Sequence, residues 1–463
     1  MKIVVFQSDK GDCLLLEGLD GSRVLVDGGM PDTYTEHVAP YLDNLRQSGG
    51  KLDVVYVSHI DEDHISGILR MMDDAVEWSI FDFQTKVALN TNFKKPEVLR
   101  PPTVDRVWHN AFHEQVEDNN GEIEDMLAAT VAVLAGGDTQ KFIRMAQFHQ
   151  DAATSIRQAI NLSRRLGEKQ LAIKLNPEAD GKLMMLRKTA DGKPPAPIKV
   201  GGMKWHIIGP AKTDLEDLKE EWQKWLRENK QTISRVEENS RRTERRIGNS
   251  LSTEINQIVG AAAAQSEMLA FKLLEKLDMS AEKKLGIRRK VTVPNLASLM
   301  FMVEEKNADG KIKTILLTGD GHHLDILSGL EMQKKIKKNG TLHVDVLKVQ
   351  HHGSEHNIDR DFCKRIIADH YIFCGNGAHA NPDLKVVEAI IDSRLSNEHK
   401  GSHSKVNQAF KLWFNSSSEN IKTQEENAAH MKKVEDLVES YRASNQGQLD
   451  CFYLKDSNFE FVV

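Results

Sequence analysis

The amino-acid sequence predicts an α/β fold whose core is interrupted by a long, mostly helical insertion. In the first third of the chain, and again after residue 291, short apolar runs bounded by glycine or aspartate alternate with helix-forming stretches. Such alternation of strand and helix patterns is typical of α/β domains. Residues 116–195 and 213–290 lack it and are rich in helix formers, which predicts a helical insertion and a helical arm.

Residues 1–115 are expected to form the first part of the core. The residues from Leu52 to Val57 are almost continuously apolar, so we expect a strand that is buried on both faces. Asp27 closes an earlier strand in a turn, a common place for an aspartate that precedes glycine. The predicted elements are strands at 4–6, 13–17, 23–26 and 52–57 and a helix at 33–47.

Residues 196–212 and 291–400 are expected to supply the remaining core strands, and the C-terminal segment 401–463 is expected to pack on that core. The motifs described below must meet in one site, so we predict one split core instead of separate domains. The predicted strands are 197–200, 204–208, 297–303, 313–317, 344–349, 371–374, 450–454 and 459–463. The predicted helices are 324–338, 360–368, 406–414 and 425–443.

The composition is that of a globular chain without strong charge. Its 463 residues include 62 Lys and Arg against 68 Asp and Glu, a formal net charge of −6. This near balance excludes a strongly basic protein that coats nucleic acid, but it leaves room for a local basic groove. The four cysteines form no disulfide or metal-finger spacing, which favours a reducing compartment. No stretch approaches the roughly 18 to 20 apolar residues of a membrane span, so we expect a cytoplasmic protein without a membrane partner.

The strongest chemical signal is an H-x-D-x-D-H pattern directly after the buried strand, formed by His59, Asp61, Asp63 and His64. Two imidazoles and two carboxylates on one short loop at a strand end can converge on metal ions. Without a cation, carboxylates packed so closely would repel one another. The alternative, a polar loop whose carboxylates cap a helix, would explain one such residue but not the whole pattern. The pattern therefore predicts a metal site.

Two later strand ends carry further candidates. Asp320 follows a strand and a glycine, and the pair His351-His352 follows the next strand. An aspartate that bridges two cations, together with a late histidine, would complete a dinuclear site. His322 and His323 are also candidate ligands, but their position at a helix start favours helix capping or solvent exposure.

In this order, the motifs resemble those of the metallo-β-lactamase superfamily. Within it they are similar to the soluble metallo-hydrolase domain of ComEC-type competence proteins and its standalone bacterial relatives. That subfamily carries H-x-D-x-D-H where H-x-H-x-D-H is commoner, a strand ending in T-G-D, an H-H-G-S stretch, an N-x-x-S element and a short G-P turn. The matching residues here are Thr318-Gly319-Asp320, His351-His352-Gly353-Ser354, Asn295 with Ser298, and Ile208-Gly209-Pro210. The resemblance covers residues 1–110, 196–212 and 291–395.

The chain departs from the family pattern at two points. Relatives often carry a histidine directly before a proline late in the core, whereas here Asn381 precedes Pro382, and His379 is the candidate replacement. The third-motif histidine of the superfamily has no secure counterpart. His109 and His206 are the candidates, although a lone histidine of this kind is more often structural than a metal ligand.

The resemblance implies an αββα sandwich whose metal site lies at one edge, where strand ends meet. It also implies two divalent cations, manganese or zinc, with magnesium as a further candidate. Asp61 takes the place of a histidine ligand, which adds negative charge and shifts the expected metal from zinc towards manganese or magnesium, unless the geometry of the site overrides this preference. The implied metal ligands are His59 and Asp61 for the first cation, Asp63, His64 and His352 for the second, and Asp320 as the bridge.

His351 is then left to stabilise or protonate a phosphate oxygen, and His351 and Asp63 are the implied catalytic residues. Adjacent residues of an extended segment point in opposite directions, so we expect only one of His351 and His352 to be a metal ligand. The cations would activate water for in-line attack on a phosphodiester.

The implied function is that of a metal-dependent hydrolase, a phosphodiesterase or nuclease with nucleic acid as its candidate substrate. Basic runs at 241–246 and 283–290 could follow a nucleic-acid backbone, although such runs more often form solvated helix faces. One alternative is a small-molecule phosphodiesterase that acts on a cyclic nucleotide or a phosphocholine ester. Another is an interaction protein with a vestigial site, whose helical insertion binds a protein partner or forms a homo-oligomer.

Overall fold

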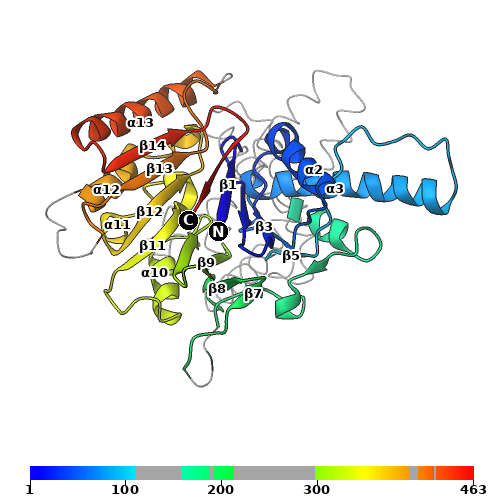
Figure 1. Cartoon of the computed structure of the whole chain (residues 1–463), viewed down its shortest axis with the longest axis horizontal. Helices are drawn as coiled ribbons and strands as arrows, with labels where there is room; N and C mark the ends of the chain where they lie inside the picture. The colour runs from blue at the N-terminus through cyan, green and yellow to red at the C-terminus, as the bar shows by residue number, and fades with distance from the viewer. Residues whose placement is uncertain are drawn as a thin grey trace, which may run out of the picture.

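Two β-sheets pack face to face, and helices cover the outer face of each (Figure 1). This computed structural model describes residues 1–110, 158–159, 161–187, 189, 192–212, 298–395, 405–421 and 424–463. The predicted α/β class is confirmed, and the layers follow the helix–sheet–sheet–helix order that the resemblance implies. The helical arm predicted at 213–290 lies outside the described residues, and the insertion predicted at 116–195 lies only partly within them.

Within the described residues, the first sheet has seven strands, most of them from the N-terminal part of the chain. Their order across the sheet is β15 (Asn458–Val462), β1 (Lys2–Phe6), β2 (Leu14–Glu17), β3 (Arg23–Val26), β4 (Val54–Tyr56), β5 (Arg106–Trp108) and β6 (Lys174–Leu175). Neighbours from β15 to β3 pair antiparallel, whereas neighbours from β3 to β6 pair in parallel. The last strand of the chain thus lies against the first, and Lys2 is opposite Val462.

The second sheet has eight strands. Their order is β14 (Leu449–Tyr453), β13 (Phe410–Phe414), β12 (Ile366–Phe373), β11 (Leu342–Lys348), β10 (Ile312–Leu317), β9 (Met300–Lys306), β8 (Met203–Gly209) and β7 (Ile198–Val200). Neighbours from β14 to β10 run parallel, and those from β10 to β7 run antiparallel. Each sheet therefore contains a block of parallel strands whose carboxyl ends lie at one edge.

An apolar core between the sheets receives alternate residues from both of them. Tyr56 and Trp108 point into it from the first sheet, and Trp205 and Phe301 point into it from the second. Edge-to-face packing puts the ring centroid of Tyr56 5.1 Å from that of Phe301, and the centroids of Trp108 and Trp205 5.3 Å apart. Aromatic pairs of this geometry stabilise a core beyond the burial of their area, so these rings join the two sheets firmly.

Each outer face has its own helical layer. The helices are α1 (Pro31–Thr33), α2 (Ala39–Gln47), α3 (Glu62–Asp82), α10 (His323–Met332), α11 (Arg360–Arg365), α12 (Leu384–Leu395) and α13 (Glu425–Ser444). Short 3₁₀ or π segments are η1 (Tyr34–Val38), η2 (Phe83–Val87), η4 (Pro177–Ala179), η6 (Gln350–Gly353) and η7 (Ala378–Ala380). Leu42 and Ile68 pack on the first sheet, whereas Leu330, Ile390 and Val434 pack on the second. Figure 1 shows α2 and α3 on one side of the sandwich and α11 to α13 on the other.

Three predicted helices differ from the structure. The helix predicted at 406–414 is wrong, because β13 occupies its second half. Phe410 and Leu412 face the helical layer while Trp413 faces the inter-sheet core, and this alternation has the period of a strand. The helices predicted at 360–368 and 324–338 are too long, because α11 ends at Arg365 and α10 ends at Met332.

The strand predicted at 371–374 is too short, because β12 begins at Ile366. The other predicted elements within the described residues are present, with ends that differ by up to three residues.

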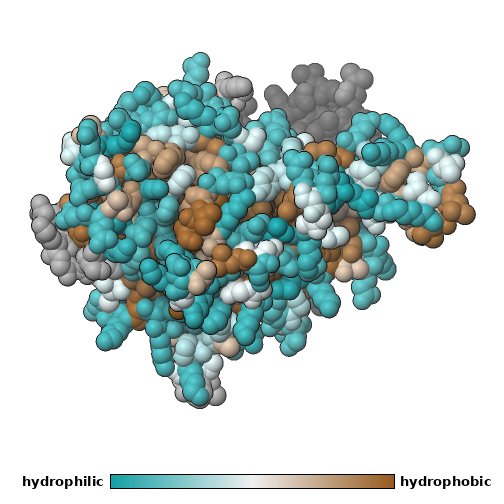
Figure 2. Space-filling view, in the orientation of Figure 1, coloured by the Kyte–Doolittle hydropathy of each residue, from teal (hydrophilic) through white to brown (hydrophobic). Residues whose placement is uncertain are grey.

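Apolar side chains gather at the projecting end of α3 and in η2, as the brown atoms of Figure 2 show on an otherwise mainly hydrophilic face. Ile80, Phe83, Val87 and Leu89 in this region are between 48% and 76% exposed. Within the described ranges, no helix combines the length and the hydrophobicity needed to cross a lipid bilayer.

The protonation of His370, in β12, is expected to make the stability of the fold depend on pH. Trp413 Nε1 donates a hydrogen bond to His370 Nδ1 at 3.0 Å, and burial, with the nearby charge of Lys411, lowers the pKa of His370 to about 4. The unfolded chain takes up this proton near pH 6.5, so the free energy of unfolding should fall as the pH drops from about 6.5 to about 4. We expect a loss of about 2 kcal/mol between pH 7 and pH 5 from this group. Denaturant unfolding at pH 7 and pH 5 measures this change in the free energy of unfolding. If a His370→Gln variant loses as much stability between these pH values as the wild type, His370 is not the group responsible.

Candidate metal centre

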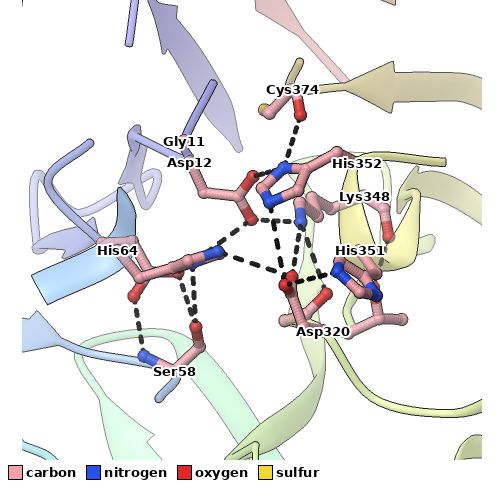
Figure 3. A network of polar contacts seen from close by, with 12 residues as sticks. Gly11, Asp12, Ser58, His64, Asp320, Lys348, His351, His352 and Cys374 are labelled. Atoms are coloured by element: carbon pink, nitrogen blue, oxygen red, sulfur yellow. Dashed lines mark hydrogen bonds and ion pairs between the residues drawn. The ribbon is translucent and has the colours of Figure 1, made fainter. Parts of the chain in front are cut away.

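The polar residues that the sequence singled out lie where parallel strands of both sheets end. His59 follows β4 of the first sheet, whereas Asp320 follows β10 and His352 follows β11 of the second. In α/β folds, ligands usually bind at the carboxyl ends of the strands. Figure 3 shows His64, from the start of α3, and His352 turned towards Asp320 from different elements. The two sheets thus bring residues that are far apart in the sequence into one cluster.

Asp320 stands at the centre of the cluster, surrounded by histidine Nε2 atoms. Its side chain is only 3% exposed. Its carboxylate oxygens lie 3.5 Å from Nε2 of His59 and of His64, and 3.7 Å from Nε2 of His351 and of His352. Four imidazoles therefore present the same ring atom to one carboxylate.

The other ring nitrogen, Nδ1, faces an acceptor behind each histidine. Nδ1 of His59 donates to Ser58 Oγ at 3.0 Å, and Nδ1 of His64 donates to Asp27 Oδ2 at 3.0 Å. Nδ1 of His351 donates to Asn357 Oδ1 at 2.6 Å, and Nδ1 of His352 donates to the Cys374 carbonyl oxygen at 2.6 Å. An Nδ1–H that donates to a fixed acceptor leaves the lone pair of the neutral ring on Nε2 and sets the orientation of the ring. The four rings are therefore oriented to bind a cation on the side of Asp320.

Two carboxylates from the segment after β4 complete the cluster. Asp61 Oδ2 lies 3.6 Å from His59 Nε2, while the Asp63 carboxylate lies 4.0 Å from His64 Nε2 and 3.1 Å from His352 Nε2. Asp61 occupies the N-cap position of α3, yet its side chain makes no capping hydrogen bond. Helix capping therefore does not account for Asp61, whose carboxylate faces a histidine instead.

The cluster fits a divalent cation. Nε2 of His59, Nε2 of His64 and Oδ1 of Asp320 are buried and find no hydrogen-bond partner among the described residues. Burying such polar atoms costs free energy unless a hydrogen-bond partner or a bound ion compensates. These three residues offer ligand atoms within 4.8 Å of one another. Ligand atoms that share one cation at about 2.1 Å lie about 3 to 3.5 Å apart, close to the separations measured here, so small movements would complete coordination.

In the protein without a cation, protonated histidines balance the carboxylates. Burial alone would lower the pKa of His352, but the carboxylates of Asp320, Asp12 and Asp63 raise it to about 10. The same carboxylates outweigh burial at His64 and raise its pKa well above the usual value. Against the effect of burial, the facing histidines lower the pKa values of Asp63 and Asp320. A cation that binds these imidazoles must displace their protons.

The expectation that His351 and His352 point in opposite directions is wrong. The pair lies in η6, not in an extended segment, and its φ angles of 46° and 54° are in the left-handed region. This turn directs both Nε2 atoms at Asp320 Oδ2. The backbone strain of two consecutive left-handed residues that are not glycine is typical of a functional site.

The three candidates for a further histidine ligand lie outside this group. His206, in β8, has its Nε2 3.0 Å from Glu304 Oε2 and belongs to an ion pair instead. His379 is exposed in η7. His109 is buried after β5, where Asn176 Oδ1 accepts a hydrogen bond from its main-chain N–H at 2.9 Å. Neither group of described residues that could hold a metal includes any of these histidines.

His322 and His323 lie at the start of α10. The capping prediction is confirmed for His322, whose side chain accepts a hydrogen bond from Leu324 N at 3.3 Å. The exposure prediction is wrong, because both imidazoles are buried. His323 Nε2 lies 3.2 Å from Asp359 Oδ2, which places this ring in a separate ion pair.

Sequence patterns did not single out Asp12 and Lys348, whose side chains are each 2% exposed and in direct contact (Figure 3). Asp12 follows β1, and its Oδ1 lies 3.3 Å from His352 Nδ1. Lys348 ends β11, and its Nζ lies 3.9 Å from Asp320 Oδ1. A signal was present: a lysine stands at an inward-facing position of an apolar strand, where it needs a buried partner.

Asp27, expected only as a turn residue, fixes Ser58 and His64 of the cluster through hydrogen bonds. Its Oδ1 accepts a hydrogen bond from Ser58 N at 2.7 Å, and its Oδ2 accepts bonds from Ser58 Oγ at 2.8 Å and His64 Nδ1 at 3.0 Å. Ser298, the described half of the N-x-x-S element, accepts a bond from Asp320 N through its Oγ at 3.3 Å. Asn295, the other half, lies outside the described residues.

Replacing Asp27 with asparagine is expected to lower the metal affinity by about 10- to 100-fold, because an amide cannot accept from all three of these donors. Calorimetric titration with manganese measures this change. Asp53→Asn is the matched control, since Asp53 also accepts a main-chain hydrogen bond, from Arg23 N at 2.8 Å, but stands outside the cluster. Equal affinities of the two variants would contradict the supporting role of Asp27.

Residues 9–74 match the family model described as the metallo-beta-lactamase superfamily. The matched segment contains His59, Asp61, Asp63 and His64, and ends before Asp320. Neither the curated proteins nor the solved structures compared with the chain gave a match. Because this superfamily is generally hydrolytic and usually binds divalent metals, the match and the cluster together indicate a metal-dependent hydrolase. The closer likeness to the ComEC type stays a prediction.

Proposed function

We propose that the protein is a metal-dependent phosphodiesterase that cleaves nucleic acid. The observation that carries the proposal is the position of Asp320 between two sets of ligand atoms, each containing histidine Nε2 and carboxylate oxygen. The first set is His59, Asp61 and Asp320, and the second is Asp63, His64, His352 and Asp320. Two cations held in this way would supply Lewis-acid stabilisation of the phosphorus centre under attack.

The ligand chemistry favours manganese, with zinc and magnesium as the other candidates. Asp61, Asp63 and Asp320 give the cluster three carboxylates beside its imidazoles. Oxygen-rich sites suit harder cations, whereas zinc sites are usually built mainly from nitrogen and sulfur ligands.

His351 is the residue best placed to move a proton. It is 24% exposed, so a bound substrate can reach it, and its Nε2 lies 3.7 Å from Asp320 Oδ2. Burial lowers the pKa of His351, which keeps the ring neutral at pH 7. With Nδ1–H donated to Asn357, the free Nε2 is the atom through which the ring would take up a proton and, once protonated, stabilise or protonate a phosphate oxygen.

The choice of nucleic acid as substrate rests on the chemistry of the site and on the resemblance to ComEC-type domains. Carboxylate-held cation pairs are suited to phosphodiesters because the developing negative charge is spread over phosphate oxygens. The basic runs at 241–246 and 283–290 lie outside the described residues and add no argument from structure. The experiment must therefore compare polynucleotides with a small phosphodiester.

The test offers single- and double-stranded DNA, RNA and bis(p-nitrophenyl) phosphate to the chelated protein after it is reloaded with manganese, zinc or magnesium. We expect polynucleotide cleavage with manganese and a loss of about 10³-fold or more in Asp63→Ala, since a lost ligand removes several kcal/mol of transition-state stabilisation. Asp361→Asn, an exposed carboxylate on α11, is the control that should retain the rate. Undiminished cleavage by Asp63→Ala would falsify the assignment.

Two other outcomes select the alternatives. Turnover of bis(p-nitrophenyl) phosphate without cleavage of any polynucleotide would favour a small-molecule phosphodiesterase. Full metal content without hydrolysis of any phosphodiester would favour an interaction protein in which the centre has a structural role. Elemental analysis of the purified protein separates this last case from a preparation that has lost its metal.

A further inference from the structure

Lys348 occupies a position where the fold otherwise places apolar side chains. It ends β11, and the preceding residue on the same face, Val346, lies in the core between the sheets together with Ile315 and Ile372 of the flanking strands. The Lys348 side chain is nevertheless 2% exposed. A buried ammonium group is costly unless it is paired and hydrogen-bonded, so a lysine here needs a compensating interaction.

The compensating interaction comes from Asp12. Lys348 Nζ is in direct contact with Asp12 Oδ2 and donates to the Gly319 carbonyl oxygen at 3.3 Å. It lies 3.9 Å from Asp320 Oδ1, whereas His351 and His352 face Oδ2 of the same carboxylate. Figure 3 shows the ammonium group between Asp12 and Asp320. The charge of Lys348 is thus shared between a central carboxylate of the cluster and a carboxylate behind it.

Asp12 could otherwise be a metal ligand. Its carboxylate, with His64 and His352, forms the second group of described residues that could hold a metal. Asp12, however, approaches the Nδ1 side of both rings, at 3.8 Å from His64 and 3.3 Å from His352. The carboxylates of Asp61, Asp63 and Asp320 approach the Nε2 side of the histidines instead. A cation beside Asp12 would displace the Nδ1 hydrogen bonds and lie against the ammonium group of Lys348, which repels it.

We propose that Lys348 is a positioning residue that takes the place of a cation beside Asp12. It neutralises Asp12, keeps this carboxylate out of the ligand set, and so confines bound metal to the Nε2 side of the histidines. The pair also helps to orient His352, because Asp12 Oδ1 lies close to Nδ1 of this ring. This inference rests on the proposed metal centre but not on the nature of its substrate.

The test counts metal ions per chain by elemental analysis after equilibration with excess manganese and removal of unbound metal. Asp12→Asn should bind as many ions as the wild type, since Asp12 is not a ligand. Lys348→Met, which keeps the length of the side chain and removes its charge, should bind one additional ion. The double variant Asp12→Asn/Lys348→Met should return to the wild-type count. Lys364→Met, at an exposed lysine on α11, is the control for loss of a positive charge.

Three outcomes would overturn the inference. They are the loss of an ion in Asp12→Asn, an unchanged count in Lys348→Met, and an additional ion that persists in the double variant. If Lys348→Met does not fold, the count in Asp12→Asn still decides whether Asp12 is a ligand, and the neutral pair in the double variant supplies a second folded comparison. A wild-type protein that binds no metal would instead contradict the proposed function, so the two failures are distinguishable.

Discussion

Replacing Asp320 with asparagine is expected to abolish hydrolysis and to reduce the number of bound metal ions. Asp320 faces the Nε2 atoms of four histidines and belongs to both of the proposed ligand sets, so an amide in its place would weaken both at once. Losing several kcal/mol of transition-state stabilisation lowers the rate of hydrolysis by at least about 10³-fold. Steady-state kinetics and elemental analysis of the same preparation measure the two effects.

The control for this substitution is Asp361→Asn, which removes an exposed carboxylate at the start of α11. It should keep its rate and its metal. Circular dichroism of Asp320→Asn should show an intact fold, since the substitution keeps the shape of the side chain in a packed site. An Asp320→Asn protein with full metal content and full rate would show that Asp320 does not connect the two sets.

The second large effect concerns pH. Because carboxylates raise the pKa of His64 and bring that of His352 to about 10, both imidazoles carry an extra proton at neutral pH in the protein without metal. Binding a cation releases these protons, so the metal affinity should rise with pH throughout the range from 6 to 8. One proton released gives about a tenfold gain per pH unit, and two give about a hundredfold.

The same two protonated histidines make the stability of the metal-free protein fall as the pH rises, whereas the metal affinity increases. A histidine with a raised pKa stabilises the folded state fully below its unfolded pKa of about 6.5, and that contribution is lost as the pH rises towards the folded value. The metal-free protein should therefore lose stability from about pH 6.5 upwards, while the loaded protein should not. Calorimetric titrations in buffers of different ionisation enthalpy count the released protons directly. An affinity that does not change between pH 6 and pH 8 would contradict the protonated state of His64 and His352.

The fold class and the cluster around Asp320 could be predicted because their signals are local. Strand ends that carry Asp320 or the H-x-D-x-D-H pattern are visible in a few adjacent residues, and topology alone brings parallel strand ends to one edge. The helix assigned to 406–414 failed for a local reason as well. With only five residues in β13, the alternation of Phe410, Leu412 and Trp413 was too short to exclude a helical period.

The other parts of the site could not be predicted, because they depend on contacts between segments that are distant in the sequence. Asp12 and Lys348 acquire a role only when β1 and β11 meet across the two sheets. The left-handed turn that directs both His351 and His352 at Asp320 requires Gly319, whose carbonyl oxygen accepts a hydrogen bond from His351 N at 3.1 Å. The inward-facing position of Lys348 indicates that it needs a buried partner, but nothing near it in the sequence identifies Asp12 as that partner.

The pairing of β15 with β1 has a consequence for how the chain is made. During synthesis, β1 emerges from the ribosome long before residues 458–462, and at about 5 to 20 residues per second the wait is on the order of half a minute. Until then β1 has an open edge that can pair with other nascent chains. Contacts between residues so far apart in the sequence form slowly, so we expect the first sheet to be completed late in folding and to benefit from a chaperone that covers this edge.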